Sequence, residues 1–311
     1  MRKTAFILLA GSLLSAQTSV LPGFPPGAFE NTAALSNVGA APSYVGPGDV
    51  VASAYEWWGL RAYSAAYATA TGRIANICTP ADAVCADVLS DTNGNFNLAG
   101  TPSLTCNNVG SICTVKILYD QSGSTNCSGP VACDVSSNTI ANRPILTINC
   151  IGSLPCMNFS TNSQVLIGVA NQASSQAQPI TISGIIERTA NFTTQEVALS
   201  ISGGTTQLYF PATTGQIAGY AGSVSVAAAA NSVFHAVQWL ASGASSILYI
   251  DGSSNSVNSG TLAINSGSTS SIAGSGGLNA GNIMELGIWA SAFSAGNQSS
   301  MNTNQHTYWG F

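Results

Sequence analysis

Charged side chains are scarce in this sequence. Asp, Glu, Lys and Arg together make up 6% of the 311 residues, whereas they form about a quarter of an ordinary soluble domain. Ser, Thr, Asn and Gly must therefore provide most of the polar surface. The net charge of −5 leaves no basic surface to neutralise the phosphates of a nucleic acid or anionic lipid headgroups. We therefore expect no nucleic acid among the partners.

A long apolar run is missing as well. The run Ala5–Leu14 follows two basic residues and is too short to span a bilayer as a stable helix. Basic residues, an apolar stretch and small residues near position 16 are typical of a secretory signal peptide. We predict a signal peptide over residues 1–16, cleaved near Ala16, and no membrane span. The alternative is an uncleaved apolar arm that packs inside a larger assembly.

The stretch 17–48 is rich in Pro and Gly, which is typical of a linker or an extended arm. The chain is 45% hydrophobic, enough to bury one large core, and all-β sandwiches of this size commonly form one domain. We therefore predict a single folded domain over residues 49–311. The scarcity of charge and the signal peptide pattern indicate an extracellular or particle-surface location.

Metal ligands are also few. There are two histidines, and no cysteine pair has the Cys-x2-Cys or Cys-x4-Cys spacing of a zinc knuckle. The segment Asp91–Asn95 places oxygen ligands at alternate positions, but it lacks the distal bidentate glutamate of a calcium loop. No Gly-rich phosphate cradle follows a predicted strand. We therefore expect neither a metal nor a cofactor.

Eight cysteines are present, in four neighbouring couples six or seven residues apart. Eight cysteines allow 105 pairings, of which four local bridges are the simplest. We predict disulfides between Cys78 and Cys85, Cys106 and Cys113, Cys127 and Cys133, and Cys150 and Cys156. Loops this short lose little entropy on closure, so each bridge would add about 2 kcal/mol and chiefly fix its loop.

The second half of the chain alternates between apolar and polar residues, which indicates short strands. The runs are Ile180–Ile186, Val197–Ile201, Leu208–Phe210, Val233–Leu240, Ile247–Ile250, Leu262–Ile264 and Met284–Trp289. Helical spacing predicts a short helix within Val51–Tyr67 and a terminal helix from Ser294 to Tyr308. Many short strands at regular spacing favour an all-β antiparallel sandwich or jelly roll.

The segment Thr114–Gly123 reads Thr-Val-Lys-Ile-Leu-Tyr-Asp-Gln-Ser-Gly and follows the second cysteine couple. It resembles the catalytic domain of the fungal-type α-L-arabinofuranosidase B family. Leu60–Ser64 and Met284–Ile288 resemble an early segment and the last strand of that domain, so the resemblance covers about residues 50–311. It implies a concanavalin-like β-sandwich with short flanking helices, in a divergent bacterial or phage relative.

Members of this family are retaining glycosidases, which need two carboxyl groups about 5 Å apart. The family's nucleophile strand corresponds to Thr206–Ala212, which contains no carboxylate. Its acid/base aspartate follows a Gly-Gly pair, and here Leu278 follows Gly276 and Gly277. The family's adjacent cysteine pair is missing too. Since an aliphatic side chain transfers no proton, this resemblance predicts that hydrolysis has been lost.

If catalysis survives, Glu285 and Glu187 are the fallback candidates for its acids, beside Glu196 and Asp251. Glu285 and Trp289 share one strand face, where an indole and a carboxylate would form a sugar-binding platform. The alternative is that Trp289 simply fills a second layer of the core.

Two acids have simpler structural explanations. Asp120 is expected to cap the turn after its strand by accepting from backbone amides two residues on. Asp251 precedes Gly252 and is expected to form a hairpin turn.

Three hypotheses follow. The first is a non-catalytic extracellular glycan-binding or structural surface module of arabinofuranosidase ancestry, with a glycan or polysaccharide as partner. The second is an active retaining α-L-arabinofuranosidase that acts on arabinose-containing polysaccharides. The third is a phage virion, fibre or appendage component whose partners are copies of itself or other subunits.

Overall fold

The computed structural model describes residues 44–127, 133–169, 172–190, 193–201, 205–212, 214–274 and 277–311. The predicted signal peptide or arm over 1–16 and most of the predicted linker over 17–48 lie outside these residues. The predicted domain boundaries therefore stay predictions.

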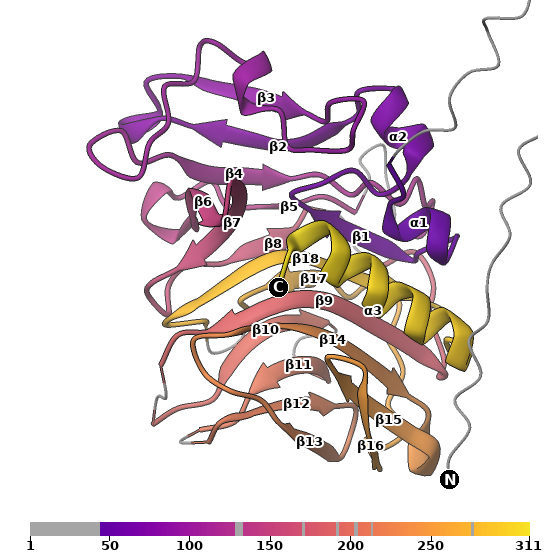
Figure 1. Cartoon of the computed structure of the whole chain (residues 1–311). Helices are drawn as coiled ribbons and strands as arrows, with labels where there is room; N and C mark the ends of the chain where they lie inside the picture. The colour runs from indigo at the N-terminus through magenta and orange to yellow at the C-terminus, as the bar shows by residue number, and fades with distance from the viewer. Residues whose placement is uncertain are drawn as a thin grey trace, which may run out of the picture. The chain divides into compact units, whose positions relative to one another are not determined.

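Antiparallel pairing arranges most of the strands of the described residues in two series (Figure 1). The first series, in spatial order, is β1 (Glu56–Gly59), β18 (Gly281–Trp289), β9 (Ile180–Arg188), β14 (Phe234–Ala241), β15 (Ser246–Ile250) and β16 (Ser253–Val257). The second series begins with β3 (Cys85–Leu89), β2 (Arg73–Cys78), β4 (Thr114–Leu118), β5 (Val135–Ser136) and β8 (Leu166–Gly168). It continues with β17 (Ser270–Ile272), β10 (Glu196–Ile201), β11 (Thr206–Phe210), β12 (Gln216–Tyr220) and β13 (Val224–Ala228).

A hairpin connects the two series. It consists of β6 (Ile145–Ile151) and β7 (Leu154–Phe159), and β6 pairs with β4 while β7 pairs with β18. The helices are α1 (Pro47–Val50), α2 (Ala65–Thr69) and α3 (Ala295–Trp309). Single 3₁₀ turns occur at Pro80–Asp82, Leu98–Gly100, Ile140–Asn142 and Gly243–Ser245. The predicted all-β antiparallel class with short flanking helices is confirmed.

Side-chain alternation places the main core between the two series. In β18, Leu286 and Ile288 belong to this core, which also contains Trp239 of β14 and Leu208 of β11. A Cβ at Gly219 of β12 would lie 2.3 Å from the Trp239 ring, so glycine allows the two layers to approach each other there. The period-2 pattern therefore identified the inner face of these strands correctly.

Helix α3 lies across the other face of the first series (Figure 1). Gln238 of β14 donates to the Gln298 carbonyl at 2.9 Å, and Gln305 donates to Ser183 of β9 at 3.1 Å. The Ser294 hydroxyl accepts from the Asn297 amide at 3.2 Å and caps the start of the helix. The predicted terminal helix is confirmed, and it covers the face that carries Glu285 and Trp289.

The predicted helix within Val51–Tyr67 is wrong for most of its length. Glu56–Gly59 forms strand β1 and pairs with β18, and only the short α2 follows. Every residue of β1 is buried, because the strand has the core on one face and a second apolar cluster on the other. Burial on both faces erases the alternation that identifies a strand. The predicted strand Leu262–Ile264 is reduced to a single bridge between Ile264 and Gln176.

All four predicted disulfides are present, and none of the eight cysteines is free. Cys78–Cys85 joins β2 to β3, and Cys150–Cys156 joins β6 to β7. The bridges therefore brace hairpins and loops of the layer that carries the N-terminal half of the domain. Among the described helices, none is long and apolar enough to cross a membrane.

Candidate functional site

The predicted sugar platform at Glu285 and Trp289 is contradicted by burial, because each residue is only 1% exposed. Trp289 packs edge-on against Phe293 and donates its indole N–H to the Val51 carbonyl at 3.1 Å. Helix α3 and the start of the domain enclose both rings in a second apolar cluster. A sugar cannot reach this face, and Trp289 fills a second core layer, as the alternative interpretation expected.

Glu285 is the centre of a buried ion pair. Its carboxylate accepts from the Arg61 Nε at 2.5 Å and from the Arg61 Nη2 at 3.0 Å. Gln305 and Trp309 of α3 each donate to it at 2.9 Å. Four donors leave this carboxylate no free position for a substrate, so Glu285 anchors α3 and is not a catalytic acid.

Glu187 and Glu196 also have structural partners. Glu187 is 8% exposed and accepts from the Asn282 side chain at 2.6 Å. Glu196 is fully buried, accepts from the Arg188 Nε at 2.7 Å and from the Asn279 amide at 2.8 Å. Burial raises the pKa of Glu196, although Arg188 opposes the shift. These two carboxylates connect strand ends. Neither lines one of the two clefts, where a catalytic acid would meet a substrate.

Asp251 occupies the first position of the expected hairpin turn, with positive φ angles at Asp251 and Gly252. Its carboxylate lies 2.7 Å from Nδ1 of His235, whose Nε2 lies 2.9 Å from the Ala230 carbonyl. Since both ring nitrogens face acceptors, this geometry suits a doubly protonated imidazolium. Burial alone would lower the pKa of His235, but these hydrogen bonds outweigh it and raise the pKa above its usual value.

The two positions that the family resemblance singles out are neighbours in space. Val197 of β10 pairs with Tyr209 of β11, and the Val197 amide donates to the Gly277 carbonyl at 2.8 Å. Gly276 lies outside the described residues. Leu278 is fully buried in the main core. Strand β11 is described over Thr206–Phe210 and carries no carboxylate.

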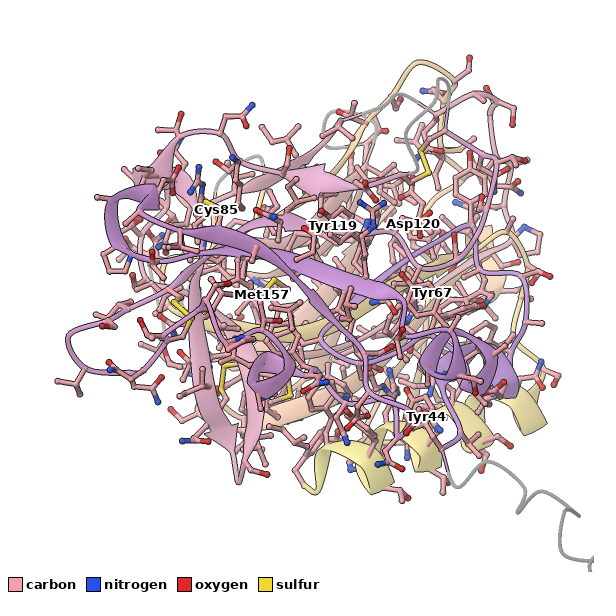
Figure 2. The ribbon with its side chains drawn as sticks, turned by 90° about the horizontal axis from the view of Figure 1, so that it is seen from above. Tyr44, Tyr67, Cys85, Tyr119, Asp120 and Met157 are labelled. Carbon is pink, nitrogen blue, oxygen red and sulfur yellow. A yellow bond between two sulfur atoms is a disulfide. The ribbon has the colours of Figure 1, made fainter. Side chains whose placement is uncertain are left out.

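Asp120, in the best-matched motif, has the expected turn-capping role. Its carboxylate accepts from the Ser122 amide at 3.0 Å and from the Trp57 amide at 3.0 Å, which ties the motif to β1. The Asp134 carboxylate accepts from the Asp120 amide at 2.8 Å. Figure 2 shows Asp120 beside Tyr119 at the end of β4. Burial raises the pKa of Asp120, and its backbone donors oppose the shift.

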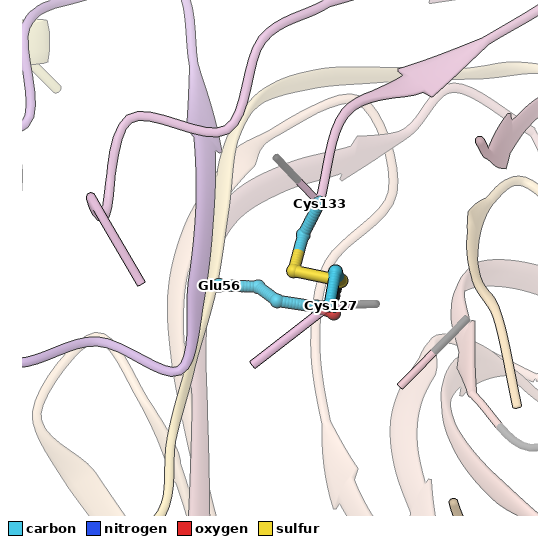
Figure 3. Close-up of side chains that lie close together, drawn as sticks. All are labelled: Glu56, Cys127 and Cys133. Carbon is cyan, nitrogen blue, oxygen red and sulfur yellow. Dashed lines mark hydrogen bonds between the residues drawn. A yellow bond between two sulfur atoms is a disulfide. The ribbon is translucent and has the colours of Figure 1, made fainter. Parts of the chain in front are cut away.

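The structure reveals one acid that the sequence interpretation missed. Glu56 of β1 is fully buried, on the core face of the strand opposite Ile288. Figure 3 shows its side chain pointing at the Cys127–Cys133 disulfide, and one carboxylate oxygen lies 3.6 Å from the Cys127 Sγ. Glu56 escaped notice because the Tyr-Glu-Trp-Trp run at 55–58 has no alternation, although a lone acid among aromatics is itself a signal of a buried carboxyl.

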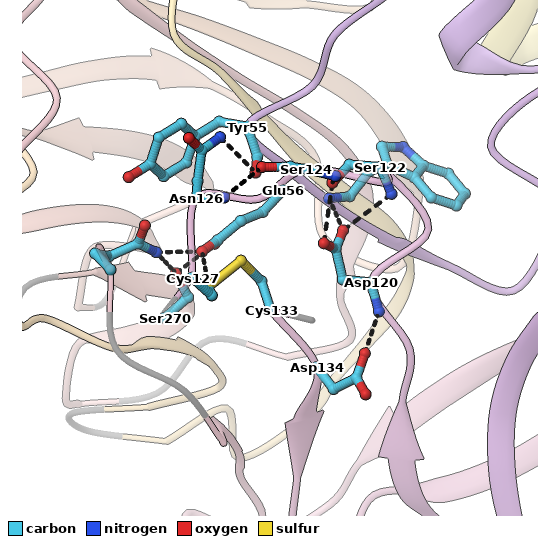
Figure 4. Close-up of a disulfide and its surroundings, with 12 residues drawn as sticks. Tyr55, Glu56, Asp120, Ser122, Ser124, Asn126, Cys127, Cys133, Asp134 and Ser270 are labelled. Atoms are coloured by element: carbon cyan, nitrogen blue, oxygen red, sulfur yellow. Dashed lines mark hydrogen bonds between the residues drawn. A yellow bond between two sulfur atoms is a disulfide. The ribbon is translucent and has the colours of Figure 1, made fainter. Parts of the chain in front are cut away.

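Neutral donors surround Glu56 (Figure 4). Gln172 and Ser270 form hydrogen bonds with its carboxyl group, and no cationic partner contacts it among the described residues. Burial raises its pKa to about 8, so the carboxyl is mostly protonated at neutral pH. The Oε1 of Gln172 is buried without a partner. In a turned Gln172 amide the oxygen would accept the carboxyl proton, since the two amide orientations are nearly isosteric.

Groups with metal-ligand chemistry occur twice in the described part of the chain, at Glu56–Cys127–Cys133 and at Cys78–Asp82–Cys85. In both groups the sulfur atoms form disulfides and are not thiolates, the form that binds metals. The Asp91 carboxylate accepts from the backbone amides of Asn93 and Asn95, each at 2.8 Å, and so holds a turn.

A cleft of about 720 Å³ opens between α3, the start of the domain and the loop around Asn93. Ser299, Thr303 and Thr307 line it from one face of α3, at four-residue spacing, and all three are exposed. Tyr308 lines it too, and its ring meets Tyr44 edge-on with centroids 5.8 Å apart. No charged side chain is among the described residues that line this cleft. We call it the α3 cleft.

A second cleft, of about 870 Å³, lies beside the β15–β16 hairpin. Its described lining includes four alanines, at 227–230, and the His235–Asp251 pair. No Phe, Tyr or Trp is among its described lining residues. The α3 cleft is therefore the better match to a sugar, which needs an aromatic surface together with hydroxyl or amide partners.

No family model and no curated protein matches the sequence. Among solved structures, a mutant GH54 α-L-arabinofuranosidase soaked with 4-nitrophenyl α-L-arabinofuranoside is similar, with a TM-score of 0.60 at 13% identity. An arabinofuranosidase complexed with arabinofuranosyl-α-1,2-xylobiose gives a TM-score of 0.59 at 13% identity. Each comparison covers 84% of this chain and 64% of the other. The chain thus has an arabinofuranosidase-like fold and spans just under two thirds of the length of these structures.

Proposed function

We propose that this protein is an extracellular glycan-binding domain that has the arabinofuranosidase-like scaffold and does not hydrolyse its ligand. The observation that carries the proposal is the state of the buried carboxyl groups. Glu285, Glu196 and Glu187 are each bound by a neighbouring side chain. Asp120 is bound by backbone amides. A retaining glycosidase needs a pair of carboxyl groups facing a substrate, and neither cleft offers such a pair among its described residues.

The α3 cleft is the proposed binding site. Its tyrosine and its row of hydroxyl groups provide an apolar surface and hydrogen-bonding partners for a sugar. The lack of charged lining groups favours a neutral glycan over an acidic one. Four disulfides support an oxidising, extracellular location.

The test is a glycan array that contains neutral and acidic plant and microbial polysaccharides. Thr303→Arg would fill the α3 cleft from an exposed position without disturbing the core. Ala295→Arg is the matched control, because Ala295 is exposed on the same helix and does not line the cleft. We expect the first variant to abolish binding and the second to retain it. Equal binding by both variants would reject the α3 cleft, and an array with no bound glycan would reject the function.

Hydrolysis is the second candidate, and the arabinofuranosidase-like fold is the observation that favours it. Glu56 has the raised pKa of a general acid, about 8, but it is fully buried and lines neither cleft. Release of 4-nitrophenol from 4-nitrophenyl α-L-arabinofuranoside would support this candidate. No release at high protein concentration would leave the binding function.

A further inference from the structure

A hydroxyl group and a side-chain amide meet at the buried carboxyl group of Glu56. The Ser270 hydroxyl of β17 donates to Oε2 of Glu56 at 2.5 Å, and the Gln172 amide binds Oε1 of the same carboxyl group (Figure 4). The Gln172 Nε2 also lies 3.4 Å from the Ser270 Oγ. One acid therefore contacts a nucleophile through one oxygen and an amide through the other, and the nucleophile and the amide contact each other.

The Ser270 oxygen lies near the amide carbon of Gln172. That carbon, Cδ, is bonded to Nε2 at about 1.33 Å and is therefore within about 4.7 Å of the Ser270 Oγ. Attack requires an approach to about 3–3.5 Å, which rotation of the two side chains can provide. Glu56, Gln172 and Ser270 are each at most 3% exposed, so water is excluded as a competing nucleophile and from any ester formed there.

The orientation of the Gln172 amide determines whether its carbonyl group can be activated. With Nε2 placed against Glu56, the Gln172 Oε1 is buried without a hydrogen-bond partner. In the turned orientation the carbonyl oxygen faces Glu56 Oε1 and accepts the carboxyl proton. The raised pKa of Glu56, about 8, supports this arrangement, because the carboxyl group then carries a proton at neutral pH.

We propose that Ser270 and Gln172 form an intramolecular ester cross-link with loss of ammonia, and that the Glu56 carboxyl group catalyses the reaction. This modification is independent of glycan binding. The cross-link joins β17 to residue 172, whose backbone pairs with Cys127, and it connects two residues that are 98 positions apart in sequence. It also gives a role to a carboxyl group in the core, where an apolar residue would avoid the cost of desolvating an acid.

The first step forms the carbon–oxygen bond. The Ser270 hydroxyl gives its proton to Glu56 Oε2 as its oxygen attacks the Gln172 Cδ, and Glu56 Oε1 gives its proton to the amide oxygen. The product is a tetrahedral carbon that carries the serine oxygen, a hydroxyl group and the amino group. Glu56 stays neutral throughout, because it takes up one proton and releases another. This suits a carboxyl group that no cation contacts among the described residues.

The second step expels ammonia. Glu56 Oε2 passes the serine proton to the amino group, the carbon–nitrogen bond breaks, and its electron pair leaves with the ammonia. The hydroxyl group on the carbon returns its proton to Glu56 Oε1 as the carbonyl group forms again. In total, a hydroxyl group and a primary amide become an ester and ammonia, with no oxidation and no co-reactant, and Glu56 is regenerated.

A second buried serine–glutamine pair provides an internal control. Gln305 donates to the Ser183 hydroxyl at 3.1 Å and to Oε1 of Glu285 at 2.9 Å, and both members of the pair are 2% exposed. Glu285, however, binds Arg61, Gln305 and Trp309, and no hydrogen bond joins it to Ser183 among the described residues. It therefore has no contact through which to take the serine proton. We expect no cross-link at this pair.

The experiment is peptide mapping of the full-length protein after its four disulfides have been reduced and alkylated. Chymotryptic digestion and tandem mass spectrometry detect two peptides linked through Gln172 and Ser270, with a combined mass lower by one ammonia. Hydroxylamine cleaves esters and should separate the two peptides, leaving a hydroxamate at Gln172. The linked peptide is the decisive readout, because cleavage near Ala16 would expose Gln17, whose cyclisation also loses ammonia.

We expect the linked peptide in the wild-type protein and its loss in Ser270→Ala and in Glu56→Gln. Glu187→Gln is the matched control, since Glu187 is a buried acid that contacts neither residue of the cross-link, and it should retain the linked peptide. Absence of the linked peptide from the wild-type protein, which requires no variant to fold, would overturn the proposal. A linked peptide that persists in Glu56→Gln, or an equal yield of a Ser183–Gln305 link, would do the same, because each shows that Glu56 is not the catalyst.

Discussion

The ion pair between Arg61 and Glu285 is expected to hold α3 on the sheet, and Glu285→Gln tests this directly. Both side chains are at most 1% exposed, and removal of one member of a buried pair costs about 3–5 kcal/mol. The amide oxygen introduced at position 285 would still accept from one of the two α3 donors, so the cost comes mainly from the unpaired Arg61. A domain with about 5–15 kcal/mol of stability would remain folded.

A double-mutant cycle with Arg61→Met separates the pair from its surroundings. In the double variant no charge is left unpaired, so the cost should fall to about 1–2 kcal/mol, the value for one orphaned neutral donor. Since Arg61→Met alone should also cost about 3–5 kcal/mol, the coupling free energy is then at least about 4 kcal/mol. Urea unfolding, followed by tryptophan fluorescence, measures each free energy of unfolding.

Glu187→Gln is the matched control, because Glu187 is also buried but accepts from a neutral asparagine. This variant should lower the free energy of unfolding by about 1 kcal/mol. Additive losses in the cycle, or a loss in Glu285→Gln no larger than in the control, would refute the role of Glu285 as the anchor of α3.

Three further predictions concern other buried groups. The pKa of Glu56 rises from 4.5 to about 8 on folding, so the native state binds the extra proton. The free energy of unfolding therefore falls as pH rises across that window, by up to about 5 kcal/mol. Urea unfolding of Glu56→Gln should show a gain in stability relative to wild type between pH 5 and pH 9, and a difference that does not change with pH would contradict this. The raised pKa of His235 adds stability that is fully present below its unfolded value of about 6.5 and is lost as pH rises through the folded value. His235→Gln should therefore lower the free energy of unfolding more at pH 5.5 than at pH 9. Thermal melts at both pH values measure this, and a larger loss at pH 9 would contradict the prediction. Trp289→Ala should lower stability by about 3–5 kcal/mol and leave glycan binding by the folded fraction unchanged on the array, whereas selective loss of binding would restore the platform hypothesis.

Local patterns were sufficient to predict much of the fold. Strands β9 and β10 were recognised because apolar residues recur at alternate positions in them, although every residue of both strands is buried. The Asp251-Gly252 pair marked its hairpin because both residues adopt positive φ. The cysteine couples were paired correctly because each lies across a short loop or hairpin.

The site was less predictable, because burial depends on distant segments. Glu285 and Trp289 alternate with Leu286 and Ile288 as an exposed face would, and nothing local shows that α3 folds back over them. Glu56 is missed for the opposite reason, since both faces of β1 are covered and its partners Gln172 and Ser270 are more than a hundred residues away in sequence.

The buried carboxyl groups of Glu285 and Glu56 have different partners, and the difference fits different roles. Glu285 has an arginine and two further donors, so its charge is compensated and it serves as an anchor. Glu56 has only neutral partners and lies against a disulfide, so its proton is retained at neutral pH. A buried acid that were purely structural would gain from a cationic partner or from replacement by an apolar residue. Among the described residues Glu56 has no cationic partner, and for that reason we regard it as the acid among them most suited to a proton-transfer role.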